Sequence, residues 1–259
     1  MAHKSYANPT NGCAPHGSEQ ASAMSASESD SDPALLAARP PLWKRMIDLG
    51  LLACTAWIWL PLATLVLCVV KLASPGPAIY RQGRVGYRGR NFMIFKFRTM
   101  RVNAETRRHE EYLEQLMSSD SPMTKLDASD SRLVPFGRFL RATGLDELPQ
   151  IFNVIRGEMS LVGPRPCTAV EFQRYRPDQR DRANAFPGIT GFWQVNGKNN
   201  TTFDEMIAMD IHYARNMSLG LDLWIIARTL PAIASQCLQT LTARTPRPAI
   251  SPAAFPRKI

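Results

Sequence analysis

Residues 143–166 of the chain are TGLDELPQIFNVIRGEMSLVGPRP. This stretch is the most informative part of the sequence. Asp146 and Glu147 are adjacent carboxylates at the start of a predicted short amphipathic helix. The loop after that helix combines a glycine and two prolines with Arg165. A carboxylate can bind a metal ion or attack phosphorus, whereas a basic loop with exposed backbone suits phosphate. The combination indicates phosphoryl transfer, although an Asp-Glu pair alone more commonly complements a helix dipole.

A long apolar segment precedes this stretch and predicts contact with a membrane. Leu49–Val70 comprises 22 residues without a charge, which is long enough to span a bilayer. Pro61 lies near its middle and removes a helix hydrogen bond, so we expect a break at Leu60–Pro61. Each half is then roughly 15–18 Å long, about one leaflet deep. Two geometries stay open, a kinked helix that spans the membrane and a re-entrant helix that leaves on the side where it entered.

Basic residues flank the apolar segment on both sides. Lys44 and Arg45 come before it, and seven Lys or Arg residues follow between positions 71 and 98. Because cytoplasmic flanks are rich in Lys and Arg, the C-terminal part is expected in the cytoplasm. The upstream pair favours the same side for the N-terminal end, which only the re-entrant geometry allows. Asp48 is expected to pair with Lys44 or Arg45, and the polar residues before the segment argue against a cleaved signal peptide.

The two ends of the chain have the composition of flexible segments. Residues 1–43 predict a disordered polar tail, and residues 242–259, with four prolines and four basic residues, predict a flexible basic tail. About 200 residues remain, enough for one domain with a membrane anchor. The net charge of +9 favours anionic headgroups or phosphorylated substrates, and no nucleic-acid-binding motif accompanies it. The five cysteines are widely spaced and form no zinc-binding pattern.

Two short strands are predicted between the apolar segment and residues 143–166. Ala78–Arg84 and Asn91–Arg98 flank a loop that contains glycines, which predicts a β-hairpin. Lys96 and Arg98 are two residues apart in the second strand, so their side chains share a face. That face is either a solvated basic surface or a site for phosphate.

The rest of the chain predicts a mainly helical α+β fold. A short helix near Val134–Arg141 carries Arg138 and Arg141, which suits either a membrane-interface helix or arginines directed at the Asp-Glu pair. Phe186–Val195 is a turn-rich apolar segment expected near the membrane, because Trp favours that boundary. The final helix is expected to be interfacial or part of the core. Further helices are predicted at Asn103–Met117, Ala169–Arg182, Phe203–Asn216 and Leu221–Gln239, with a polar loop at residues 118–132.

Several motifs occur together in a specific order. They are Lys96-Phe-Arg-Thr-Met100, Leu145-Asp-Glu-Leu-Pro-Gln150, Gly157-Glu-Met-Ser-Leu-Val-Gly-Pro-Arg-Pro166 and Pro187-Gly-Ile-Thr-Gly-Phe-Trp-Gln194, followed by Asp222 and its apolar helix. In this order they resemble the bacterial sugar transferase family, the monotopic polyprenyl-phosphate phosphoglycosyl transferases. The resemblance covers Lys44 to Ser235 and corresponds to a minimal catalytic unit.

The resemblance implies a reaction and roles for individual residues. Members of this family move a phosphosugar from a UDP-sugar to undecaprenyl phosphate and release UMP, which starts exopolysaccharide, capsule or O-antigen synthesis. Asp146 is implied as the nucleophile that forms a covalent phosphosugar intermediate, and Glu147 as either a Mg²⁺ ligand or a proton acceptor. Mg²⁺ at Asp146 and Glu147 is the implied cofactor. The residues expected to neutralise the diphosphate are Lys96, Arg98, Arg141 and Arg165.

The resemblance also favours one of the two membrane geometries. It implies a re-entrant helix over residues 44–74, kinked at Pro61, with both ends in the cytoplasm. Residues 75–241 then form a small catalytic domain with interfacial amphipathic helices on the cytoplasmic face of a bacterial inner membrane. The expected partners are the UDP-sugar, undecaprenyl phosphate and membrane phospholipids, without nucleic acid. Both a monomer and a homodimer fit.

Three positions depart from the family pattern. Many relatives have Ser where this chain has Leu60 or Gly144, and Trp is commoner where it has Met217. These changes concern the helix break, a helix cap and an interfacial aromatic, and none touches the Asp-Glu pair.

Two other functions fit part of the pattern. A metal-dependent membrane lipid-phosphate hydrolase would use water as the acceptor and release inorganic phosphate. A non-enzymatic lipid-binding scaffold of an envelope-assembly complex would not need the Asp146 carboxylate.

Overall fold

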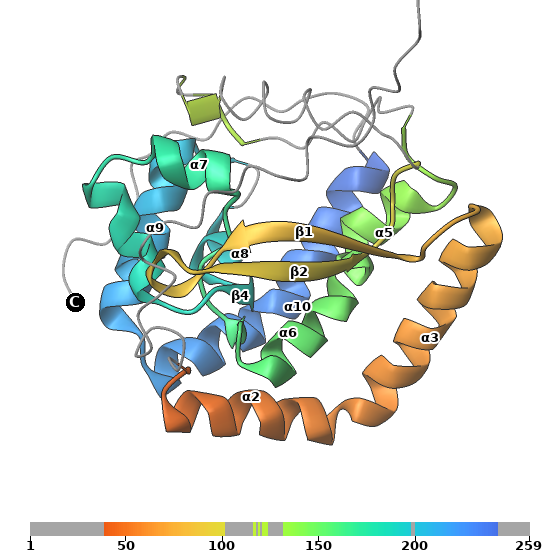
Figure 1. The fold of residues 1–259 in the computed structure, drawn as a ribbon, viewed down its shortest axis with the longest axis horizontal. Coiled ribbons are helices and arrows are strands. Elements are labelled where there is room, and N and C mark those ends of the chain that lie inside the picture. Colours follow the sequence, from red (N-terminus) through yellow and green to blue (C-terminus); the bar gives the residue numbers. More distant parts are fainter. Residues whose placement is uncertain are drawn as a thin grey trace, which may run out of the picture.

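A β-hairpin crosses the middle of the molecule, and helices surround it (Figure 1). The computed structural model describes residues 39–101, 116–117, 119, 121–123, 132–197 and 200–242. Strands β1 (Ile79–Val85) and β2 (Asn91–Phe97) are antiparallel, with Ile79 opposite Phe97 and Val85 opposite Asn91. The short 3₁₀ turn η2 (Tyr87–Gly89) joins them. The predicted hairpin is therefore confirmed.

A second pair of strands was not predicted from the sequence. β3 (Ser160–Val162) and β4 (Gly188–Thr190) pair in parallel. Their backbones approach so closely that a Cβ on Gly163 would lie 2.1 Å from the carbonyl oxygen of Phe186, so only glycine fits there. Strands of three residues are too short to show a periodic pattern. Their pairing brings the Pro164–Pro166 loop next to the segment that follows Pro187.

Helices form most of the remaining structure, which confirms the mainly helical α+β class. α9 (Phe203–Asn216) has the predicted bounds and begins with a capping box formed by Thr202 and Glu205. The predicted helix Ala169–Arg182 is instead divided, because Tyr175 is extended and Pro177 disfavours a helical residue before it. The resulting segments are α7 (Ala169–Arg174) and the 3₁₀ segment η5 (Asp178–Asn184). The other helices here are α5 (Gly137–Thr143), α6 (Ile151–Arg156), α8 (Phe192–Asn196) and α10 (Leu219–Thr242).

Some predicted segments lie outside the described residues. These are almost all of both tails, most of the Asn103–Met117 helix and most of the loop at residues 118–132.

The apolar segment forms two helices that meet at a corner (Figure 1). α2 (Leu42–Cys54) ends before Thr55, and α3 (Ala56–Ala73) begins after it and continues through Pro61. The helix is thus interrupted at Thr55 and not at Leu60–Pro61. A bend of the helix axis at Pro61 stays a prediction.

Two side-chain hydrogen bonds are made at the break. The Thr55 hydroxyl donates to the carbonyl of Leu51 at 2.6 Å, which also accepts the Thr55 N–H at 3.0 Å, and the indole N–H of Trp59 donates to the carbonyl of Leu52 at 2.9 Å. The Trp59 bond joins the start of α3 to the last turn of α2, where helical donors are lacking. Pro61 removes one bond inside α3 without ending that helix.

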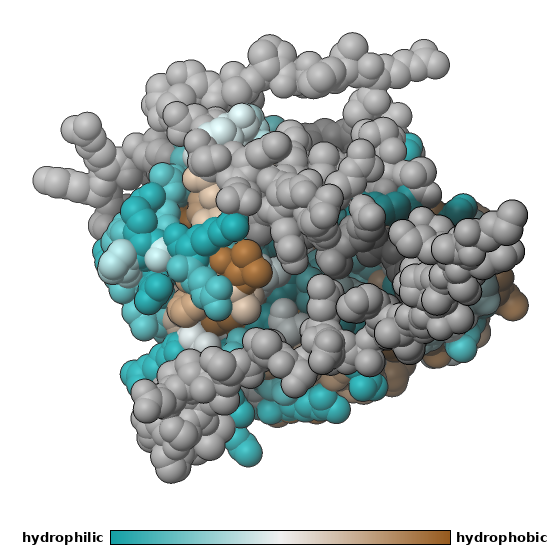
Figure 2. All heavy atoms as spheres, turned by 45° about the horizontal axis from the view of Figure 1, so that its top comes forward, coloured by the Kyte–Doolittle hydropathy of each residue, from teal (hydrophilic) through white to brown (hydrophobic). Residues whose placement is uncertain are grey.

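α3 is apolar and largely exposed. Among the described residues it is the one helix long and apolar enough to cross a membrane, with a mean hydropathy of 2.0 and 11% of it buried. In Figure 2 hydrophobic surface appears along the lower right edge of the molecule, on the side where Figure 1 places α3, and a smaller hydrophobic patch lies left of the centre. Large exposed apolar side chains also occur at α5, α6 and α10, namely Phe136, Phe139, Phe152, Ile155, Leu223 and Leu230.

A buried polar network attaches the start of α2 to the rest of the molecule. The side chain of Lys44 is 1% exposed, and its Nζ donates to the Tyr213 hydroxyl on α9 at 2.8 Å and to Asp222 on α10. The Tyr213 hydroxyl lies 2.7 Å from Asp222 Oδ1 and 3.1 Å from the carbonyl of Val162 in β3. Four elements therefore meet at one buried ion pair.

Asp48 was predicted to pair with Lys44 or Arg45, and its charge does interact with that of Lys44, but its hydrogen bonds go elsewhere. Its Oδ1 accepts hydrogen bonds from the backbone N–H of Leu161 at 3.0 Å and from the hydroxyl of Ser160 at 3.1 Å. Arg45 donates instead to two carbonyls at the end of α6. Lys44 and Asp48 are one turn apart on the buried face of α2, so the elements packed against that face supply their partners.

We predict that Lys44→Met destabilises the protein by about 3–5 kcal/mol, because it leaves the Asp222 carboxylate buried without its cation. The double variant Lys44→Met/Asp222→Leu should recover part of this loss, since no charge is then left unpaired. Unfolding of detergent-solubilised protein by urea measures both effects.

The exposed pair formed by Arg215 and Asp181, 2.7 Å apart, is the matched control. Arg215→Met should cost less than about 1 kcal/mol. A Lys44→Met variant as stable as Arg215→Met would contradict the structural importance of the buried pair.

Candidate active site

The adjacent carboxylates lie in a 3₁₀ turn between two short helices. This turn, η4 (Leu145–Gln150), follows α5 directly, and Gly144 between them has a left-handed backbone with a φ of 74°. The N–H of Glu147 donates to the carbonyl of Gly144 at 3.0 Å. Asp146 is 8% exposed, and Glu147 is half-buried. The predicted amphipathic helix thus begins as a tighter turn, because Pro149 within η4 has no N–H to donate, and regular α-helix starts only in α6.

Lys96 and Glu147 form an ion pair beside this turn. The Lys96 Nζ lies 2.8 Å from the Glu147 Oε1, and the two side chains are 25% and 32% exposed. β2 packs along η4, which brings these residues together across 51 positions of sequence. The ion pair favours a phosphate site over a solvated basic surface for this face of β2, because Lys96 points at the Asp-Glu pair instead of at bulk solvent.

Arg98, two residues further on, has a buried and incompletely bonded guanidinium. The residue is 6% exposed, and its Nη2 donates to the carbonyl of Ser74 at 2.7 Å. Its Nε and Nη1 are buried without a hydrogen-bond partner in the part of the chain that the structure describes. Leaving charged donors unpaired in an interior is costly, so this site favours the arrival of an anion.

Arg141 lies in the last turn of α5, and α5 packs against η4. It is half-buried and lies five positions before Asp146. Its position on the chain therefore keeps it beside the turn that carries the two carboxylates.

The Pro164–Pro166 loop is held by its backbone, and Arg165 projects from it. Four consecutive carbonyls, those of residues 164–167, each accept a hydrogen bond from a different donor. In order, the donors are the N–H of Gly188 at 2.9 Å, Arg182 Nη2 at 2.8 Å, Arg84 Nη1 at 3.1 Å and the N–H of Val85 at 2.8 Å. These bonds hold the backbone of the loop in place. The Arg165 side chain, which is 27% exposed, is the charged group that the loop presents.

Buried charges that the sequence did not single out support this loop. The Glu171 carboxylate lies 3.4 Å from Arg165 and 3.7 Å from Arg84, and Arg182 pairs with Asp210. Burial alone would raise the pKa of Glu171, but Arg165 and Arg84 outweigh it and hold that pKa below its ordinary value. The Thr168-x-x-Glu171 capping box was a local signal for one of these residues. The partners of the other charged residues come from distant parts of the chain and leave no local pattern.

The Asp-Glu pair and Arg165 lie toward opposite ends of the hairpin. Lys96, which holds Glu147, is opposite Tyr80, whereas Val85 at the other end of β1 pairs with Cys167. Four strand residues lie between Tyr80 and Val85, so these two backbone positions are roughly 17 Å apart. Lys96, Arg98 and Arg141 lie near the η4 end of the hairpin, whereas the backbone of Arg165 lies near the other end.

The Asp-Glu pair fits Mg²⁺ only as part of a shared site. Among the described residues no group of three or more His, Cys, Asp or Glu side chains could hold a metal ion. Mg²⁺ is commonly bound by one or two carboxylates together with substrate phosphates and water. Asp146 and Glu147 therefore suit a Mg²⁺ ion that binds together with a diphosphate, and they do not form a complete protein cage.

Known proteins are similar to this chain in sequence. A galactosyl transferase, CpsE, from Streptococcus agalactiae is 45% identical over 159 residues, which cover 61% of this chain and 35% of the relative. An undecaprenyl-phosphate galactose phosphotransferase from Salmonella typhimurium is 41% identical over 165 residues, which cover 61% of this chain and 33% of the relative. The exopolysaccharide production protein ExoY from Sinorhizobium fredii is 38% identical over 192 residues, 73% of this chain and 84% of the relative.

The chain matches about a third of the length of the first two relatives and most of the third. Residues 40–236, which contain every motif of the site described above, match the profile of the bacterial sugar transferases. The chain belongs to the bacterial sugar transferase family.

Proposed function

We propose that this protein transfers a phosphosugar from a UDP-sugar to undecaprenyl phosphate and releases UMP. The observation that carries the proposal is a nearly buried carboxylate, Asp146, next to the ion pair of Glu147 and Lys96 and packed beside an exposed apolar helix. Relatives named as undecaprenyl-phosphate galactose and glucose-1-phosphate transferases support the lipid carrier and the type of donor. The reaction is the first membrane step of exopolysaccharide, capsule or O-antigen synthesis.

The transfer takes place in two displacements at one phosphorus atom. A carboxylate oxygen of Asp146 attacks the sugar-bearing phosphorus of the UDP-sugar, an O–P bond to the enzyme forms, and the bond to UMP breaks. A phosphate oxygen of undecaprenyl phosphate then attacks the same phosphorus. The new P–O–P linkage forms on the lipid, and the Asp146 carboxylate is released unchanged. No oxidant, reductant or net proton is required.

Neighbouring charges make this attack of one anion on another feasible. Lys96 partly neutralises Glu147, so the carboxylate pair repels an incoming diphosphate less strongly. Mg²⁺ bound by Asp146 and Glu147 together with diphosphate oxygens would supply further positive charge. Arg98 and Arg141 at the same end of the hairpin supply cations without a metal.

Arg165 is proposed to bind the donor at a distance from the reacting phosphorus. Its rigid loop lies at the far end of the hairpin, and an extended nucleotide sugar can reach from η4 toward it. A preorganised arginine loses little entropy on binding phosphate, because its loop is already fixed.

A re-entrant membrane helix is the geometry that the packing supports. Lys44 at the start of α2 is buried against α9 and α10, while Val66 and Val70 in the second half of α3 pack against Phe97 and Leu140. Both ends of the apolar segment thus contact the same folded body, and its middle carries exposed apolar side chains such as Trp57. We propose that this middle part enters one leaflet of the inner membrane, with the catalytic domain on the cytoplasmic face.

We predict that Asp146→Asn lowers the rate of UMP release by at least about 10³-fold, because it removes the nucleophile. Lys96→Met should lower the rate by about 10–100-fold, because it leaves Glu147 uncompensated. The assay contains detergent-purified protein, Mg²⁺, undecaprenyl phosphate and a panel of UDP-sugars, with Arg215→Met as a control expected to retain full activity.

The products distinguish this function from its alternatives. Release of inorganic phosphate from undecaprenyl phosphate, without UMP, would indicate a lipid-phosphate hydrolase. Full genetic complementation by Asp146→Asn would indicate a scaffold.

The re-entrant geometry predicts that both ends of the chain are shielded from the periplasm. In a cysteine-free background, Ser31→Cys and Asn216→Cys should resist a membrane-impermeant maleimide in intact cells and react after lysis. Labelling of Ser31→Cys alone in intact cells would instead establish a spanning helix.

A further inference from the structure

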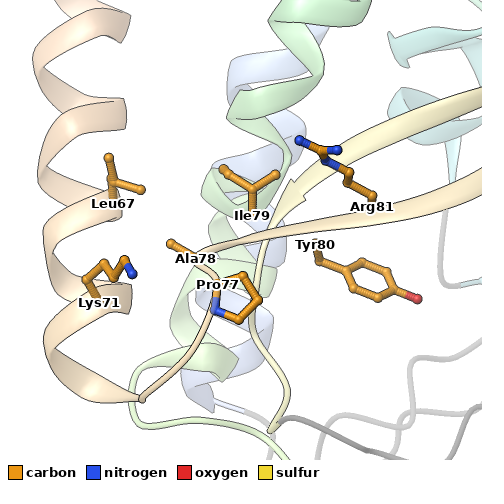
Figure 3. Close-up of a pocket in the computed structure, with 7 residues that line it drawn as sticks. All are labelled: Leu67, Lys71, Pro77, Ala78, Ile79, Tyr80 and Arg81. Atoms are coloured by element: carbon orange, nitrogen blue, oxygen red, sulfur yellow. The ribbon is translucent and has the colours of Figure 1, made fainter.

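An open groove of about 620 Å³ lies between the last turns of α3 and the start of β1. Leu67 and Lys71 of α3 form one wall, and residues 77–81 form the other. Figure 3 shows Leu67 and Lys71 directed toward Pro77 and Ala78, with Ile79 and Arg81 on one side of β1 and Tyr80 on the other. The walls are apolar except for the Lys71 ammonium, the Tyr80 hydroxyl and the Arg81 guanidinium. The groove therefore combines an apolar channel with cations.

A third basic residue, Arg98, is bonded to the groove wall through its backbone, although its side chain is not part of the lining. The N–H of Arg98 donates to the carbonyl of Ala78, which lines the groove, at 2.8 Å. The Arg98 guanidinium bonds the carbonyl of Ser74, one turn after Lys71, and keeps two buried donors without a partner among the described residues. Among the described residues the Lys71 ammonium makes one long bond, of 3.4 Å, to the carbonyl of Gly76. Lys71 is thus a weakly bonded cation in the groove wall, and Arg98 is a buried cation next to that wall.

The groove adjoins the turn that carries Asp146. Leu145 and Leu148, on either side of the two carboxylates, pack against the buried cluster that contains Val70 and Ala78. Arg98 is two residues from Lys96 on the same face of the strand, roughly 6.6 Å along it. A phosphate bound at Arg98 would therefore lie close to the phosphorus that is transferred.

We infer that this groove binds the lipid acceptor, a polyprenyl phosphate, with its phosphate at Arg98 and Lys71 and its isoprenoid chain along Leu67, Pro77 and Ile79. The inference rests on the proposed function. It assigns Arg98 and Lys71 to the acceptor phosphate and leaves the other basic residues of the site for the UDP-sugar. An isoprenoid matches the apolar walls and the exposed surface of α3, whereas a nucleotide or sugar would leave its hydroxyl groups unbonded there. The charge of the groove complements that of the lipid phosphate.

Kinetics of the two half-reactions test the assignment. Lys71→Gln removes a cation from the groove, and Leu67→Trp fills it. Both should raise the KM for undecaprenyl phosphate by about tenfold or more, whereas the burst of UMP from the UDP-sugar without acceptor keeps its amplitude and rate. Leu72→Trp, at a neighbouring position that is 89% exposed, is the matched control and should leave both steps unchanged.

An equal rise in the KM for the UDP-sugar, or an unchanged KM for the acceptor in both variants, would overturn the assignment. Arg98→Gln should show the same pattern as Lys71→Gln, but its burial makes the two α3 variants the decisive ones.

A binding measurement independent of turnover separates this inference from the proposed function. A photoreactive short-chain polyprenyl phosphate should cross-link to residues 67–81, and undecaprenyl phosphate should compete with it. Undecaprenol, inorganic phosphate and phosphatidylglycerol should compete weakly. Equal competition by phosphatidylglycerol, or cross-links elsewhere, would overturn the lipid-acceptor site. Specific cross-linking without any UMP release would support the groove and contradict the transferase reaction.

Discussion

The buried ion pair between Lys44 and Asp222 is the constraint on which the arrangement of the molecule depends. An ammonium in an interior needs a counter-charge, and a carboxylate left there alone costs several kcal/mol. The pair is satisfied only where the first helix, α2, meets α9 and α10, which hold Tyr213 and Asp222. The start of the apolar segment and the C-terminal helices are thereby joined in one body.

The charged side chains of the candidate site lie toward two different ends of the hairpin. At one end, Lys96 holds Glu147, and the groove beside α3 opens toward exposed apolar surface. At the other end, Arg165 projects from a loop whose carbonyls are all bonded. An enzyme that joins a water-soluble donor to a membrane-bound acceptor needs such a division, because its two substrates come from different solvents. In the proposed reaction the attacking Asp146 carboxylate lies at the end of the hairpin where the groove is inferred to hold the acceptor.

Local sequence signals predicted the elements that depend on neighbouring residues. The hairpin and α9 were found because alternation, turn residues and a capping box act within a few positions. Other features of the apolar segment were not visible in the local sequence. A kink was expected at Leu60–Pro61, but the helix is interrupted at Thr55 and continues through Pro61. Asp48 was expected to pair within its own helix, yet Leu161 and Ser160 supply its hydrogen bonds.

The amino-acid sequence by itself determined the family, the mainly helical class, the apolar segment and the identity of the Asp-Glu pair, because motifs and composition are properties of order along the chain. Only the tertiary structure decided which basic residue meets which carboxylate. Lys96 meets Glu147 across 51 positions, and Arg165 meets Glu171 instead of the pair. Arg98 is buried with two donors that find no partner in the part of the chain that the structure describes. These contacts depend on the packing of β2 against η4 and of β3 against β4. Burial and pairing over such distances are properties of the folded chain, since the cost of an unpaired charge arises only once packing removes water.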